Sequence, residues 1–145
     1  MGRASASGIR CRIEMSRVDV IEEAKRYLET VPNVKWAFEK SAIEVEPPDP
    51  SGYRMALDED EEEAVLWCHH WHQHFDNAED CLRLFKNLIE RRSRVIAVTR
   101  GSNECSWTLE VFEDGAWASM GMTGLIFVAF WKRKGEIFYE NAPRV

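Results

Sequence analysis

The chain lacks the short motifs by which many enzymes and metal proteins are recognised. Its cysteines at positions 11, 68, 81 and 105 include no Cys-x-x-Cys pair, so neither a zinc ribbon nor a thioredoxin-like site is indicated. The glycine-rich nucleotide loops, the Gly-x-Ser-x-Gly elbow and the His-Glu-x-x-His helix are also missing. With no motif that specifies a reaction, we expect a protein that is not an enzyme.

Long hydrophobic runs are missing as well. The longest, Leu125 to Trp131, has seven residues, whereas a membrane-spanning helix needs about 20. Residues 1–17 are basic and rich in serine but lack the apolar core of a secretory signal. We therefore expect a cytoplasmic protein with reduced cysteines and no membrane contact. Residues 1–15 are interpreted as a flexible tail, or as a mis-assigned start that precedes the true first residue, Met15.

Positive charge is in short supply, with 19 Lys and Arg against 25 Asp and Glu, a net charge of −6. The run Asp58 to Glu63 contains six acids and accounts for this whole excess, since 25 − 6 = 19. A nucleic-acid-binding domain usually has a pI above about 9, and the sequence pI here is about 5.3. We therefore expect no nucleic acid partner.

Apolar residues are plentiful, at 45% of 145 positions. A chain of this length can bury roughly 68 to 70% of the surface exposed by its unfolded form. This predicts a real hydrophobic core, and we expect residues 16–145 to form a single domain.

The apolar periodicity predicts two helices. Ser16 is a candidate N-cap for a first helix that runs to about Val31. A second helix is expected from Ala78 to near Ser93, capped by Asp76-Asn77. Its apolar stripe consists of Cys81, Leu82, Phe85, Leu88 and Ile89.

Alternating apolar residues between turn signals predict the strands. A loop with three prolines at 46–52 and a hairpin turn at Asp114-Gly115 separate some of them. The expected strands are 35–45, 53–57, 64–75, 94–100, 106–112, 117–120, 125–131 and 136–140, of which 125–131 should be central and buried on both faces. This order predicts an α+β fold, a mainly antiparallel sheet with two helices packed on one face in the order α-βββ-α-ββββ(β).

All four histidines lie in the segment 64–75, directly after the acidic run. As a strand, this segment has Val65, Trp67, Trp71 and Phe75 on one face and Cys68, His70, His72 and His74 on the other. A helix is the alternative, and it would gather Ala64, Trp67, Trp71 and Phe75.

The histidines are candidate metal ligands. On a strand, His70 and His72 would be about 6.8 Å apart and could converge on one zinc ion, while His74 would be about 13.6 Å from His70. A zinc site would then need a third ligand from elsewhere, either Asp76 or an acid of the run. The alternative is a half-exposed strand without metal, because the spacing matches no established zinc motif.

Two functions follow from this pattern. The first is a small acidic, non-catalytic domain that binds a basic protein partner through an acidic hairpin and the adjoining His/Trp strand. Its contact residues would be Asp58, Glu59, Asp60, Glu61, Glu62, Glu63, Trp67 and Trp71. The alternative is a zinc-binding domain or metal-dependent hydrolase that uses His70 and His72. The sequence does not indicate an oligomeric state.

Overall fold

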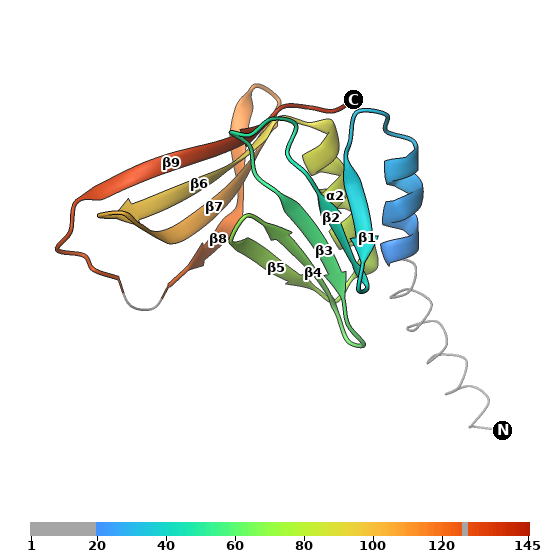
Figure 1. Ribbon diagram of the computed structural model, residues 1–145, viewed down its shortest axis with the longest axis horizontal. Helices are drawn as coiled ribbons and strands as arrows, with labels where there is room; N and C mark the ends of the chain where they lie inside the picture. Colours follow the sequence, from blue (N-terminus) through green and yellow to red (C-terminus); the bar gives the residue numbers. More distant parts are fainter. Residues whose placement is uncertain (1–19, 126–127) are drawn as a thin grey trace.

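A computed structural model describes residues 20–125 and 128–145 and shows an α+β fold dominated by antiparallel strands (Figure 1). The predicted tail at 1–15 and the start of the first helix at Ser16 lie outside the described residues. A first helix is formed by residues 20–29. The later elements are β1 (Trp36–Glu39), β2 (Ala42–Val45), β3 (Met55–Glu59), β4 (Ala64–Cys68), β5 (Trp71–Phe75), α2 (Ala78–Glu90), β6 (Ser93–Arg100), β7 (Asn103–Glu113), β8 (Ala116–Gly124) and β9 (Lys134–Asn141).

The strands form two sheets, where the sequence predicted one. The first sheet has the order β1-β2-β3-β4-β5 and the second the order β8-β7-β6-β9, with all neighbouring strands antiparallel. The edge strands β5 and β8 meet through a side chain, because Thr123 Oγ1 lies 3.2 Å from His72 N and 3.3 Å from His72 O. No backbone ladder joins β5 to β8 among the described residues, so the sheets remain separate.

Two predicted strands are hairpins in the structure. The segment 35–45 turns at Lys40 and Ser41, whose φ angles are 52° and 68°. The segment 64–75 turns after Cys68, and His69 has φ 56°. The order of strands and helices matches the prediction, but five strands precede α2 in place of three.

The turn at His69 also corrects the predicted faces of the segment 64–75. Trp67 pairs with His72, and Cys68 pairs with Trp71. Cross-strand partners lie on the same face of a sheet, so Trp67 and Trp71 lie on opposite faces. The prediction that they share a face is wrong, because it assumed uninterrupted alternation through the turn.

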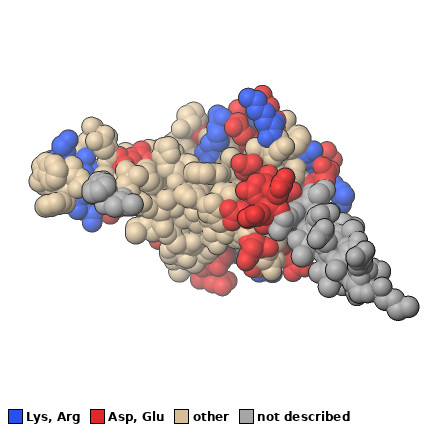
Figure 2. Space-filling view, turned by 90° about the horizontal axis from the view of Figure 1, so that it is seen from below, with Lys and Arg blue, Asp and Glu red and all other residues tan. Residues whose placement is uncertain are grey.

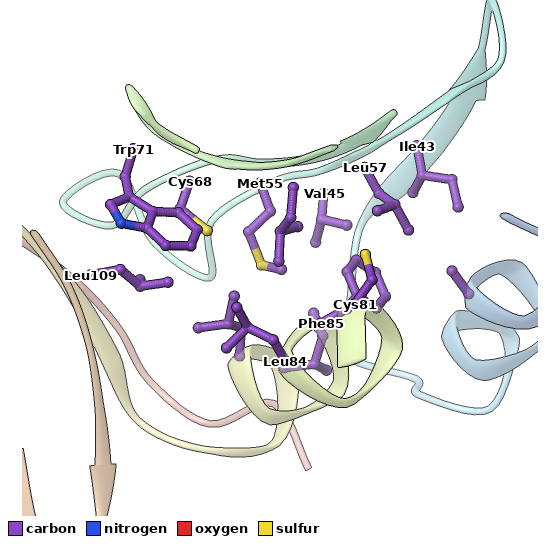
Figure 3. Packing of buried hydrophobic residues seen from close by; sticks show 14 of the residues in the cluster. Ile43, Val45, Met55, Leu57, Cys68, Trp71, Cys81, Leu84, Phe85 and Leu109 are labelled. Carbon is purple, nitrogen blue, oxygen red and sulfur yellow. The ribbon is translucent and has the colours of Figure 1, made fainter. Parts of the chain in front are cut away.

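Both helices cover one face of the first sheet, as Figure 3 shows for α2. Asn77 caps α2 by accepting hydrogen bonds from the backbone N–H groups of Glu79 and Asp80, at 2.9 and 3.3 Å. The cap was predicted. The buried residues of α2 are Cys81, Leu84, Phe85, Leu88 and Ile89. The predicted stripe is therefore right except that Leu84 is buried where Leu82 was expected, and Leu82 is only partly buried.

The second sheet contributes to the same core. Val95 and Ala97 on β6 and Leu109 and Val111 on β7 are fully buried and belong to one cluster with the residues of the first sheet and the helices. The hairpin between β7 and β8 turns at Asp114 and Gly115, with φ angles of 50° and 79°, as predicted. Strand β9 then returns to pair with β6.

The segment 125–131 was predicted to be a central buried strand. Residues 126 and 127 lie outside the described residues, and none of the others belongs to a strand. Leu125, Phe130 and Trp131 have exposed fractions of 54%, 74% and 73%. The prediction is wrong for Leu125 and residues 128–131, because β9 takes the place beside β6 and these residues lie outside the strands.

Candidate functional site

The acidic run forms the tip of the β3–β4 hairpin. Asp60 builds the turn, since its Oδ1 accepts hydrogen bonds from the backbone N–H groups of Glu62 and Glu63, at 2.8 and 2.9 Å. Its own backbone N–H donates to the carbonyl of Glu63 at 3.0 Å. A side chain that accepts from the backbone two and three residues later is typical of aspartate in turns. Asp60 therefore has a structural role, and it holds the neighbouring acids at an exposed tip.

A pocket of about 640 Å³ adjoins the hairpin. Figure 2 shows acidic side chains gathered around this end of the molecule. The five carboxylates that line the pocket come from both the hairpin and the start of α2, namely Glu59, Glu62, Glu63, Asp76 and Glu79. Several like charges around a concave surface concentrate the electric field and attract cations.

An aromatic strip connects the hairpin to the outer face of the first sheet. Trp67, with 39% of its surface exposed, stacks on His72 with ring centroids 4.4 Å apart. The rings of His72 and His74 are 5.4 Å apart, and Nδ1 of His74 lies 2.6 Å from Oε1 of Glu63. Trp67, His72, His74 and the acidic hairpin therefore form one continuous surface.

Trp71, predicted to contact a partner, is buried in the core. Only 1% of its surface is exposed, and its indole Nε1–H donates to the carbonyl of Gly121 at 3.1 Å. A side chain in this position cannot touch a partner unless the core opens, so Trp71 is removed from the candidate surface. Sequence reasoning missed this because the turn at His69, which reverses the chain just before Trp71, contains no glycine or asparagine that would indicate it.

The three candidate metal ligands are not brought together. His72 and His74 share the outer face of β5, whereas His70 lies in the β4–β5 turn with its ring 5.1 Å from that of Trp107 on β7. Over residues 20–125 and 128–145, no group of three or more His, Cys, Asp or Glu side chains is placed to hold a metal ion. The predicted pair His70 and His72 is thus split by the turn.

A second cluster was not predicted. Glu104 accepts hydrogen bonds from Trp107 Nε1 at 2.7 Å and from the hydroxyl of Tyr139 at 2.6 Å, and its Oε1 lies 2.8 Å from His69 Nε2. These partners come from β7, β9 and the β4–β5 turn, so one carboxylate ties the two sheets together. Sequence reasoning missed it because His69 and Tyr139 are each 35 residues from Glu104 in the chain, and the four residues match no motif.

Electrostatics define what Glu104 can do. Partial burial raises its pKa, but the hydrogen bonds from Tyr139, Trp107 and His69 outweigh burial, and the net effect is a lowered pKa. The hydrogen bond that the Tyr139 hydroxyl donates to Glu104 raises the pKa of Tyr139 to about 12. Glu104 is therefore held as a carboxylate acceptor, whereas a general acid at neutral pH needs a raised pKa. Its arrangement is that of a structural junction.

The thiols of Cys68 and Cys81 are not activated. Burial raises the pKa of Cys68 well above its ordinary value, and it raises that of Cys81 to about 12 with a smaller contribution from Glu59. A nucleophilic cysteine needs a lowered pKa so that the thiolate is present. Both residues therefore serve as small apolar core side chains.

Comparison of the chain with protein family models, with curated proteins and with solved structures found no match.

Proposed function

We propose that this protein is a non-catalytic binding domain that recognises a basic protein partner through its acidic hairpin, residues 58–63, together with Trp67. The observation that carries the proposal is the continuity of this surface, because the His74–Glu63 contact joins the acidic tip to the strip that contains the exposed Trp67. Trp71 is not part of it.

Three acidic side chains of the hairpin contribute no polar contacts to the described part of the fold. Among the described residues, the side chains of Asp58, Glu61 and Glu62 take part in no hydrogen bond or ion pair. Unpaired surface charge of one sign accelerates the encounter with an oppositely charged partner. These three acids are therefore the ones we expect to attract a basic surface.

Trp67 supplies the apolar part of the surface. Tryptophan is enriched among the residues that carry most of the binding energy in interfaces. Its ring is fixed by the stack on His72, so little conformational entropy is lost when a partner covers it. The acidic pocket, at about 640 Å³, has room for a long cationic side chain of that partner.

Affinity capture with matched variants tests this function. The variant Asp58→Asn/Glu61→Gln/Glu62→Gln removes three charges at the tip, and Glu29→Gln/Glu46→Gln/Asp114→Asn removes three exposed charges elsewhere. We expect basic proteins to be retained by the wild type and the control and lost from the hairpin variant. Identical retention by all three proteins would contradict the proposal.

The zinc-dependent alternative gains no support from the geometry, because the turn separates His70 from His72. Elemental analysis of the purified, untagged protein tests it directly. Near-stoichiometric zinc that disappears in His70→Ala/His72→Ala would revive that alternative. We expect no such zinc.

A further inference from the structure

Exposed apolar side chains gather at the end of the second sheet where the β6–β7 turn and the connection from β8 to β9 lie. Nine large hydrophobic residues are exposed among the described residues, and four of them lie in or beside the segment that connects β8 to β9. They are Met122, Leu125, Phe130 and Trp131. Such concentration is a property of a binding surface, since single exposed hydrophobic residues are normally scattered.

Cations adjoin these apolar side chains. Lys132, Arg133 and Lys134 are all exposed, and Arg100 lies beside them at the end of β6. Within residues 130–138 the only acid is Glu136. Figure 2 shows this end of the molecule as a mixture of uncharged and basic surface, at the opposite end from the acidic cluster.

Lys132 and Arg133 contact the β6–β7 turn. The backbone N–H of Gly101 donates to the carbonyl of Arg133 at 2.8 Å. Gly101 has φ +64°, and a Cβ there would lie 3.1 Å from Cδ of Lys132. Phe130 and Trp131 are held next to each other, with ring centroids 5.4 Å apart. The aromatic and basic residues therefore project together from the tip.

We propose that this tip, defined as Leu125, Phe130, Trp131, Lys132, Arg133 and Lys134, docks on the surface of an anionic lipid bilayer. Aromatic rings, tryptophan above all, are enriched at the interface between lipid headgroups and acyl chains. Lysine and arginine near the surface are attracted to anionic lipids. The contact is peripheral: no helix among the described residues is long and apolar enough to cross a membrane.

The chemistry of the tip favours an anionic bilayer over a second copy of the chain or a nucleic acid. A two-fold contact between two copies through this tip would bring Lys132, Arg133 and Lys134 of each copy against the same cations of the other, which is unfavourable. A nucleic acid would use the cations and stack on the rings, but it gives no environment for the exposed aliphatic side chains of Met122 and Leu125. An anionic bilayer accommodates both kinds of group.

Membrane docking departs from the expectation of no membrane contact, which rested on the missing spanning segment and the missing apolar core of a secretory signal. It also stands apart from the proposed protein partner, because the two surfaces lie at opposite ends of the molecule (Figures 1 and 2). Acidic groups at the far end would be repelled by the bilayer, so the molecule should dock with its acidic hairpin pointing away.

The first test is co-sedimentation of the full chain with two kinds of vesicle, one of phosphatidylcholine alone and one of equal parts phosphatidylcholine and phosphatidylserine. We expect binding to the anionic vesicles and much weaker binding to the neutral ones. Lys132→Gln/Arg133→Gln/Lys134→Gln should weaken partitioning about 100-fold, at about fivefold for each cation. Lys35→Gln/Lys40→Gln/Arg83→Gln removes the same charge elsewhere and should have little effect.

A second measurement reports insertion. A quencher attached to the lipid acyl chains should reduce tryptophan fluorescence in the wild type. Trp131→Phe keeps an apolar ring and should still bind, but it should lose most of this quenching. Absence of binding to anionic vesicles by folded protein would overturn the proposal, and so would equal binding by the tip and control variants. Self-association abolished by the tip variant, without vesicle binding, would assign this end to a second copy instead.

Discussion

Glu104 connects three separate elements through one carboxylate. Its donors lie on β7, on β9 and in the β4–β5 turn, and the donor–acceptor distances are 2.6 to 2.8 Å. Hydrogen bonds to a charged group contribute more to stability than neutral ones, about 1.5 to 3 kcal/mol each. Removing a shared acceptor leaves several partly buried donors unsatisfied at once.

We therefore expect Glu104→Ala to lower the free energy of unfolding by about 2 to 4 kcal/mol, and Glu104→Gln by less because one carbonyl acceptor remains. Chemical denaturation measures both values. Glu136→Gln, at an exposed position on β9, is the control and should change stability by less than about 0.5 kcal/mol. Equal stability of Glu104→Ala and the wild type would show that the junction is not structural.

The lowered pKa of Glu104 also predicts a pH dependence. A carboxyl whose pKa is lower in the folded than in the unfolded protein stabilises the fold at pH values above its ordinary pKa of 4.5. This stabilisation is lost as the pH falls through the folded-state pKa. Stability should therefore decline on acidification below that value, less steeply in Glu104→Gln. Parallel curves for the two proteins would contradict this attribution.

Arg144 is a charged side chain in an apolar setting. Only 4% of its surface is exposed, and its three guanidinium nitrogens have no hydrogen-bond partner among the described residues. Burial lowers its pKa, and proximity to Tyr53 compensates only in part. Its backbone N–H donates to the carbonyl of Ile89 at 3.0 Å, a contact that does not depend on the side chain.

Arg144→Met should consequently increase the free energy of unfolding, by about 1 to 3 kcal/mol, because an uncompensated buried charge is replaced by an apolar chain of similar length. Thermal and denaturant unfolding provide the measurement. The exposed Arg91→Met serves as control and should be close to neutral. Destabilisation by Arg144→Met would mean that the guanidinium has a favourable partner in solution.

At the scale of elements, the sequence predicted the fold where local signals were strong. The Asn77 cap, four of the five residues in the apolar stripe of α2 and the Asp114-Gly115 hairpin were predicted correctly. The turns at Lys40-Ser41 and at His69 were missed, because residues other than Gly and Asn rarely adopt positive φ and give no turn signal. The exposed positions of Leu125, Phe130 and Trp131 were missed because hydrophobicity alone does not say whether a segment is buried.

The missed β1–β2 turn yields a prediction of its own. Ser41 has φ 68°, a conformation that glycine adopts without steric cost. Ser41→Gly should stabilise the protein by about 0.5 to 1 kcal/mol, since the strain relieved exceeds the entropy lost. Ser51→Gly, at a site without positive φ, is the comparison. If denaturation shows Ser41→Gly to be less stable than the wild type, the turn conformation assigned here is incorrect.

At the scale of the whole molecule, charge is divided between two ends. The acidic hairpin and the start of α2 surround one pocket, and residues 130–134 carry aromatic and basic side chains at the end away from it (Figure 2). Sequence composition predicted the acidic surface because six acids are consecutive. The Glu104 junction and the division into two sheets could not be predicted, since both depend on contacts between distant parts of the chain.

The acidic hairpin is the surface that we propose recognises a basic partner. The most direct test is the association rate between the protein and a basic partner obtained by affinity capture, measured at low and at physiological salt. We expect Asp58→Asn/Glu61→Gln/Glu62→Gln to slow association by about tenfold at low salt and to reduce its salt dependence, while the control with three distant neutralised acids behaves as the wild type. Equal association rates for the hairpin variant and the wild type at both salt concentrations would contradict the claim.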